Sequence, residues 1–170
     1  MSNDVCGYIE HDGFYPESDL LEYLSKSELG VFRVPKEHLY NYPEEFLPSE
    51  KDFIFLIGDA PGYPNATYLI DYEEYDPDEC DMGFSPCPKE RVRILLGILT
   101  DLSLLLRAKK LVFSITENSQ ISHVKRISID DLDCAVISDF EKYKSCSGQP
   151  IPDSGLSFSS ATAGGNPSLN

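Results

Sequence analysis

The chain has few basic residues and no long apolar run. Lys and Arg number 14 among 170 residues, against 29 Asp and Glu, and the formal net charge is −15. A chain this acidic repels phosphate groups, which argues against direct binding to nucleic acid or to an anionic membrane. The most apolar stretch, Ile94–Leu106, covers 13 residues and contains polar ones. A membrane span needs about 20 apolar residues, so this stretch predicts a buried helix.

Motifs of catalysis and of metal binding are also missing. The three histidines, His11, His38 and His123, stand in no recognisable signature with a nucleophile, and no Gly-x-Ser-x-Gly occurs. Cys80 and Cys87 are too far apart for the short spacing of a zinc site. We therefore expect no enzyme, no catalytic residue, no metal site and no cofactor.

The N-terminal residues and the cysteines bear on the compartment. Residues 1–10 have no basic cluster followed by an apolar run, so we expect no signal peptide. Five cysteines cannot all pair within one chain, and without a secretion signal they are expected to be reduced thiols in the cytoplasm. These are Cys6, Cys80, Cys87, Cys134 and Cys146.

The apolar patterns predict an α+β fold. Helical spacing is found in Glu17–Leu29, Lys89–Lys110 and Asp130–Tyr143. Strand patterns occur in Val31–Val34, Phe53–Ile57, Ala66–Tyr72, Leu111–Thr116 and Ile121–Ile129. This order predicts a mainly antiparallel sheet of two hairpins, with a long central helix and two shorter helices packed on it.

A change in composition near residue 145 suggests the domain boundary. The last 26 residues contain 14 Ser, Gly or Pro and a single charged residue, Asp153. Such a segment cannot bury enough apolar surface to offset its ordering entropy. We predict one domain over residues 1–144 and a flexible tail over residues 145–170.

The negative charge lies almost entirely in the first half of the chain. Residues 1–88 hold 20 acidic and 4 basic residues, a net of −16, and nine of the ten tyrosines. Residues 89–170 hold 9 acidic and 10 basic residues, a net of +1. An acidic half that is also rich in tyrosine predicts a surface for a basic partner, because tyrosine offers contact area at low entropy cost and carboxylates orient Lys and Arg.

The densest part of this half is the acidic run, Asp71–Asp81. Seven of its eleven residues are carboxylates and two are tyrosines. A solvated loop is the simpler interpretation, and a calcium loop fails because Cys80 and Cys87 stand where ligands are needed. We predict instead that it binds the partner, through Asp71, Tyr72, Glu73, Glu74, Tyr75, Asp76, Asp78, Glu79 and Asp81.

Three segments of the first half resemble the SUKH superfamily. They are a glycine-led short strand, an apolar strand ending in a glycine turn and a following strand, at Leu29–Pro35, Phe53–Asp59 and Thr67–Asp71. The resemblance implies an immunity protein, which neutralises a cognate toxin by binding it.

The charge and the resemblance lead to one functional prediction. We expect an immunity-type inhibitor of a basic protein, such as a toxin with nuclease activity, that acts by occlusion. The alternatives are an acidic adaptor or docking subunit of a larger assembly, and a small hydrolase with a reactive cysteine. The sequence does not predict the oligomeric state.

Overall fold

The computed structural model describes residues 4–58, 88–116, 121, 123–145 and 154–159. Within these residues the fold is α+β, with a mainly antiparallel sheet and three α-helices. The helices are α1 (Glu17–Lys26), α2 (Pro88–Leu105) and α3 (Leu132–Ser145). The strands are β1 (Asp4–Glu10), β2 (Gly30–Arg33), β3 (Phe53–Gly58), β4 (Lys110–Thr116), β5 (His123–Ile127) and β6 (Ser154–Ser159).

The order of the strands across the sheet is β2-β3-β1-β4-β6-β5. The first four strands are antiparallel neighbours, and β1 lies between β3 and β4. β6 continues the antiparallel pattern beside β4, and β5 runs parallel to β6. The sheet therefore has β1 near its centre, although β1 is the first strand of the chain.

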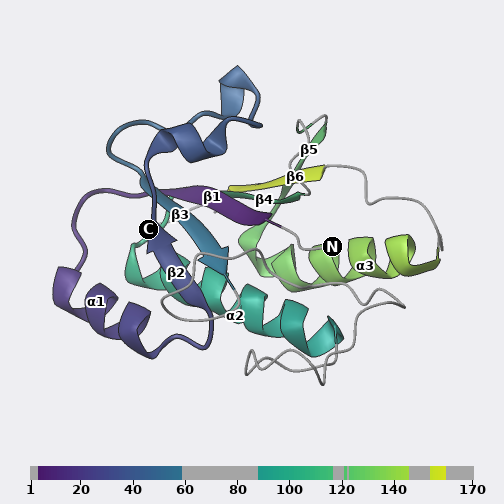
Figure 1. The fold of residues 1–170 in the computed structure, drawn as a ribbon, viewed down its shortest axis with the longest axis horizontal. Helices are drawn as coiled ribbons and strands as arrows, with labels where there is room; N and C mark the ends of the chain where they lie inside the picture. The colour runs from purple at the N-terminus through teal and green to yellow at the C-terminus, as the bar shows by residue number, and fades with distance from the viewer. Residues whose placement is uncertain (1–3, 59–87, 117–120, 122, 146–153, 160–170) are drawn as a thin grey trace, which may run out of the picture.

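The three helices cover one face of the sheet, and they lie below the sheet in Figure 1. Alternate residues of the strands point to this helix-covered face, because successive side chains of a strand alternate between its two sides. The resulting core is aliphatic and aromatic, and α2 contributes the largest helical part, with Leu95, Leu96, Ile98, Leu99 and Leu102.

The opposite face is covered by the loop between β2 and β3, drawn above the sheet in Figure 1. Two short 3₁₀ helices lie in this loop, η1 (Lys36–Leu39) and η2 (Glu44–Phe46). Its smaller core contains apolar residues and also polar ones, in particular Cys6, Tyr8 and Tyr42.

The three predicted helices are present. α1 ends at Lys26 rather than Leu29, and α3 begins at Leu132 after the 3₁₀ helix η4 (Ile129–Asp131). α2 ends at Leu105, before Lys110, because Arg107 has a positive φ of 51° and the Ala108 amide donates to the Ser103 carbonyl at 2.8 Å. Many helices end with a residue of positive φ and a hydrogen bond of this kind. That residue is usually glycine, but here it is Arg107.

The hairpin predictions need correction. The first predicted hairpin would begin with β3, but β3 pairs with β1 on one side and with β2 on the other. Its expected partner, Ala66–Tyr72, lies outside the described residues. The prediction of a second hairpin is wrong, since β4 and β5 are both strands but β6 lies between them. Residues 145–170 were predicted to be a flexible tail, but Ser154–Ser159 within this segment forms β6 and is part of the sheet. The alternation of Leu156 and Phe158 with smaller residues supports this strand.

Candidate functional site

The acidic run predicted to bind the partner lies outside the described residues. It belongs to the connection between β3 and α2, within residues 59–87. This applies to every residue of the prediction: Asp71, Tyr72, Glu73, Glu74, Tyr75, Asp76, Asp78, Glu79 and Asp81.

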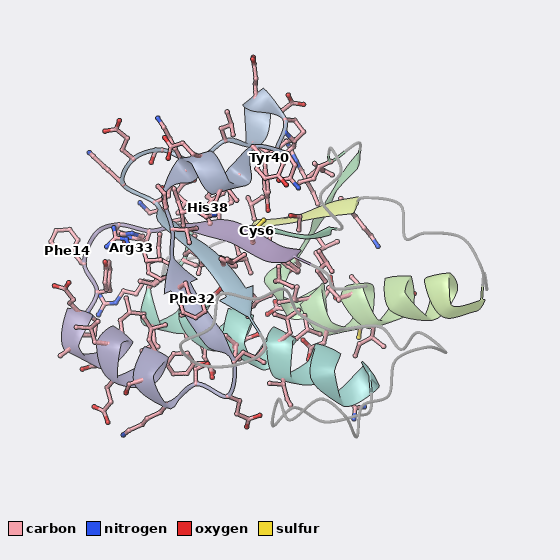
Figure 2. The ribbon with its side chains drawn as sticks, in the orientation of Figure 1. Cys6, Phe14, Phe32, Arg33, His38 and Tyr40 are labelled. Carbon is pink, nitrogen blue, oxygen red and sulfur yellow. The ribbon has the colours of Figure 1, made fainter. Side chains whose placement is uncertain are left out.

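The structure does describe the charged side chains in the earlier part of the acidic half, up to residue 58. Between residues 10 and 52, ten carboxylate side chains are exposed, and only Asp52 is buried. The same range has four basic side chains, all exposed. Two aromatic side chains of this range are also exposed, Phe14 by 79% and Tyr40 by 61%. Figure 2 shows Phe14 before α1 and Tyr40 on the loop above the sheet. The exposed carboxylates are Glu10, Asp12, Glu17, Asp19, Glu22, Glu28, Glu37, Glu44, Glu45 and Glu50.

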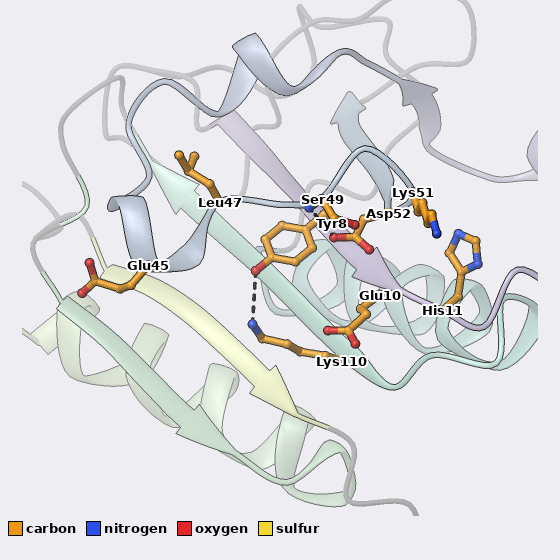
Figure 3. A pocket seen from close by; sticks show the side chains of 9 residues that line it. All are labelled: Tyr8, Glu10, His11, Glu45, Leu47, Ser49, Lys51, Asp52 and Lys110. Atoms are coloured by element: carbon orange, nitrogen blue, oxygen red, sulfur yellow. Dashed lines mark hydrogen bonds between the residues drawn. The ribbon is translucent and has the colours of Figure 1, made fainter.

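A surface pocket of about 420 Å³ opens at one edge of the loop-covered face (Figure 3). β1 and β4 form one wall, and the chain from η2 to the start of β3 forms the other. Three carboxylates and two ammonium groups surround it, which makes it polar and gives it an excess of one negative charge. The lining residues are Tyr8, Glu10, His11, Glu45, Leu47, Ser49, Lys51, Asp52 and Lys110.

Tyr8 and Lys110 meet on the wall that β1 and β4 form. The Lys110 Nζ donates a hydrogen bond to the Tyr8 Oη at 3.2 Å. The same nitrogen lies 5.5 Å from the centre of the Tyr8 ring and 5.9 Å from that of the Phe46 ring. Both distances are within the range at which an aromatic ring attracts a cation. The pocket therefore already holds one cation against aromatic side chains.

Asp52 is the buried carboxylate of the pocket. It is 8% exposed and stands one residue before β3. The Ser49 amide donates to its Oδ2 at 2.7 Å, which fixes the turn between η2 and β3. Among the described residues this is the one hydrogen bond that the carboxylate receives, so Oδ1 keeps its capacity to accept another.

The surroundings of Tyr8 disfavour ionisation of its phenol. Burial, followed by the charges of Asp52 and Glu10, raises the pKa of Tyr8 to about 12. At neutral pH Tyr8 is therefore a neutral hydroxyl, which accepts the hydrogen bond from Lys110.

Behind Tyr8, the loop-covered core contains a group of buried polar side chains. The Tyr42 Oη donates to the Cys6 carbonyl at 2.7 Å, and the Cys6 Sγ lies 3.6 Å from the Ser114 Oγ. Burial is the main reason why the pKa of Tyr42 is well above its ordinary value. These contacts attach the loop to β1 and β4, and so they hold the wall of the pocket in place.

The cysteines and histidines show no catalytic arrangement in the described residues. Cys6 is buried against Ser114, and Cys134 is exposed on α3. The His11 Nδ1 accepts a hydrogen bond from the Gly13 amide at 2.9 Å, and its ring packs edge-on against Tyr15. In the described ranges no three or more His, Cys, Asp or Glu side chains are grouped so that they could hold a metal ion.

Two further observations concern the chain as a whole. No helix in the described parts of the chain combines the length and the apolar character that crossing a membrane requires. Comparison with protein-family models, with curated proteins and with solved structures finds no match to this chain. The resemblance to the SUKH superfamily therefore stays a prediction, and function has to be inferred from the chain's own residues.

Sequence reasoning did not find the pocket. Its main residues, Tyr8, Asp52 and Lys110, come from three segments that only the sheet brings together. Each of them is unremarkable in its own stretch of sequence. The acidic composition was the one available signal, and it identifies a half of the chain rather than a position in it.

Proposed function

We propose that the protein is an immunity-type inhibitor that binds a basic protein partner and neutralises it by occlusion, without chemistry. The observation that carries the proposal is the charge asymmetry: the first 88 residues have a net charge of −16 and nine of the ten tyrosines. The ten exposed carboxylates between residues 10 and 52 support it, because they form few ion pairs with the four basic side chains of that range and stay available to a partner.

The acidic run supplies the specific contacts in this proposal. Tyr72 and Tyr75 are the anchors, and the surrounding carboxylates pair with Lys and Arg of the partner. Close charge pairs at such interfaces couple by about 1.5–7 kcal/mol, whereas pairs at the rim contribute much less. A few of the seven carboxylates therefore dominate the affinity. The partner fits a toxin that acts in the cytoplasm, such as a nuclease, whose substrate groove is basic.

The first test is to capture the partner and measure its inhibition. The full chain serves as bait in a lysate of its source organism at low and at high salt. We expect one basic protein to be retained at low salt and weakened at high salt, with its activity lost at a 1:1 ratio. Capture without loss of activity would support an adaptor instead, and the absence of any captured protein would leave the acidic run as a solvated surface.

A pair of charge-matched variants tests the role of the acidic run. One variant carries Glu73→Gln, Glu74→Gln and Asp76→Asn, and the control neutralises three exposed carboxylates of the second half, Asp130, Asp131 and Asp133, to Asn. We expect the first variant to associate more slowly with the captured partner and with a weaker salt dependence. The control should keep most of the association rate. Equal rates for the two variants would contradict the proposed contact.

A further inference from the structure

The pocket beside Tyr8 has the features of a site for one positively charged side chain. Its carboxylates outnumber its ammonium groups, three to two. In Figure 3 the carboxylates of Asp52 and Glu10 lie on one side of the Tyr8 ring, and Glu45 lies on the other. A group that enters beside the ring therefore meets negative charge from two directions.

Asp52 distinguishes this pocket from a cluster of solvated carboxylates. Exposed carboxylates such as Glu10 and Glu45 are hydrated, whereas Asp52 is 8% exposed and has only the Ser49 amide as a donor among the described residues. Removing a carboxylate from water is costly unless donors or a cation compensate for it. A guanidinium or ammonium group in the pocket would add a charged donor to the single amide that the Asp52 carboxylate receives.

Lys110 shows that the pocket accepts a cation. Its ammonium group is held by the Tyr8 hydroxyl and lies over the rings of Tyr8 and Phe46. The lining carboxylates outnumber the ammonium groups with Lys110 included, so the pocket keeps an excess of negative charge. An anion would meet these carboxylates at short range, so the pocket disfavours it.

We propose that this pocket is the anchor site for a single Arg or Lys side chain of the basic partner, held by Asp52 and Glu10 beside the Tyr8 ring. The inference rests on the proposed function and adds a position to it. The partner would then also contact the loop-covered face, where Tyr40 and Leu47 are exposed. A buried charge pair surrounded by such residues is the usual form of an interface hot spot.

The test uses N-acetyl-argininamide as the probe and the neutral N-acetyl-citrullinamide as its matched control. Both are titrated into the full-length protein and followed by backbone amide NMR. We expect the arginine probe to shift the amides of Ser49, Asp52 and His11, and the citrulline probe to leave them in place. Shifts spread over all exposed carboxylates would overturn the proposal.

Three variants make the test specific. Asp52→Asn should lower the affinity for the arginine probe about tenfold, because a charge-assisted hydrogen bond is lost. Its Oδ1 can still accept from the Ser49 amide, so the turn is retained. Lys110→Met removes the competing ammonium group and should raise the affinity severalfold. Glu28→Gln removes an exposed carboxylate elsewhere and should change nothing.

The direction of the Lys110→Met effect is the strictest criterion, since an anion site would lose affinity in that variant. The proposed function and this inference can also fail separately. If Asp52→Asn leaves the affinity for the captured basic partner unchanged while the variant of the acidic run weakens it, the pocket is not the anchor and the inhibitor proposal stands. If no partner is inhibited by the wild-type protein, the proposed function fails whatever the probe does.

Discussion

The two faces of the sheet are covered in different ways and contain different chemistry. The helix-covered face packs aliphatic and aromatic side chains from α1, α2 and α3 against alternate strand residues. The loop-covered face buries a thiol, hydroxyls and phenols under a chain with only short 3₁₀ turns. Regular helices satisfy their own backbone hydrogen bonds, whereas an irregular loop needs polar side chains to complete them.

This difference assigns different roles to the two faces. The helix-covered face supplies most of the apolar burial and hence most of the stability. The loop-covered face has fewer apolar contacts, but it carries the pocket, the buried Asp52 and the exposed Tyr40. Binding residues are often found on loops positioned by a rigid scaffold, and here the sheet and its helices form that scaffold.

The largest expected effect comes from the helix-covered face. Leu99 of α2 is fully buried, and Leu99→Ala should lower the free energy of unfolding by about 2–5 kcal/mol because it leaves a cavity. Leu104 is on the same helix but is 73% exposed, so Leu104→Ala should change the free energy of unfolding by less than about 0.5 kcal/mol. Urea unfolding of both variants measures this difference, and similar values would contradict the assignment of the buried side of α2.

The second prediction concerns the close approach of β1 and β4. Gly7 pairs with Phe55 on one side and Phe113 on the other, and a Cβ at Gly7 would come within 2.1 Å of the Val112 carbonyl oxygen. Gly7→Ala therefore requires the strands to move apart, and we expect a loss of about 1–3 kcal/mol.

Gly97 provides the matched control for this substitution. It lies on the exposed side of α2, and a Cβ there meets no atom within 4 Å. Gly97→Ala should stabilise the protein by about 0.5–1 kcal/mol, because alanine loses less conformational entropy in a helix. Thermal unfolding measures both variants. Shifts of the same sign would show that the strand spacing at Gly7 is not restrictive.

How well the sequence predicted each element depends on how many of its sides are buried. α2 was predicted because its leucines recur every three or four residues, a period that one buried side produces. β1 was missed because Val5 and Ile9 point to one face while Cys6 and Tyr8 point to the other, and both faces are buried. Such a strand has no polar alternation by which it could be recognised.

The errors at β6 and at the candidate site have a different origin, which is long-range pairing. β6 is rich in serine and glycine, and it becomes a strand through its partners β4 and β5 rather than through its own composition. The pocket likewise joins residues as far apart as Tyr8 and Lys110. Composition predicted an acidic binding surface, but neither of these contacts can be read from a local pattern.

The third prediction tests the polar core of the loop-covered face. Tyr42→Phe removes a buried hydrogen bond to the Cys6 carbonyl, and this loss should cost about 1–2 kcal/mol. Tyr23→Phe removes a comparable bond, to the Asp101 carboxylate at 3.0 Å, but at the surface between α1 and α2. Water can replace this donor, so we expect a smaller loss, about 0.5 kcal/mol. Equal losses in urea unfolding would contradict the contrast between the two faces.

The smallest effect at neutral pH is expected for Tyr8→Phe, which loses one hydrogen bond from Lys110 at the rim of the pocket, about 0.5 kcal/mol. At alkaline pH the ionisation of Tyr8 also contributes to the difference in stability between the wild type and Tyr8→Phe. The pKa of Tyr8 is raised from 10.0 to about 12 on folding, so the folded protein keeps a proton that the unfolded chain releases. The resulting stabilisation is present below pH 10 and is lost as the pH rises toward 12.

The free energy of unfolding of the wild type should therefore fall more steeply than that of Tyr8→Phe between about pH 10 and pH 12. Tyr23 also has a raised pKa and contributes equally to both proteins. The pKa of Tyr42 is raised mainly by burial, and the charge of Tyr8 is the last of its causes. The difference between the two slopes therefore comes mainly from Tyr8. Parallel curves would mean that folding does not raise the pKa of Tyr8, and that neither burial nor the charges of Asp52 and Glu10 act on the phenol.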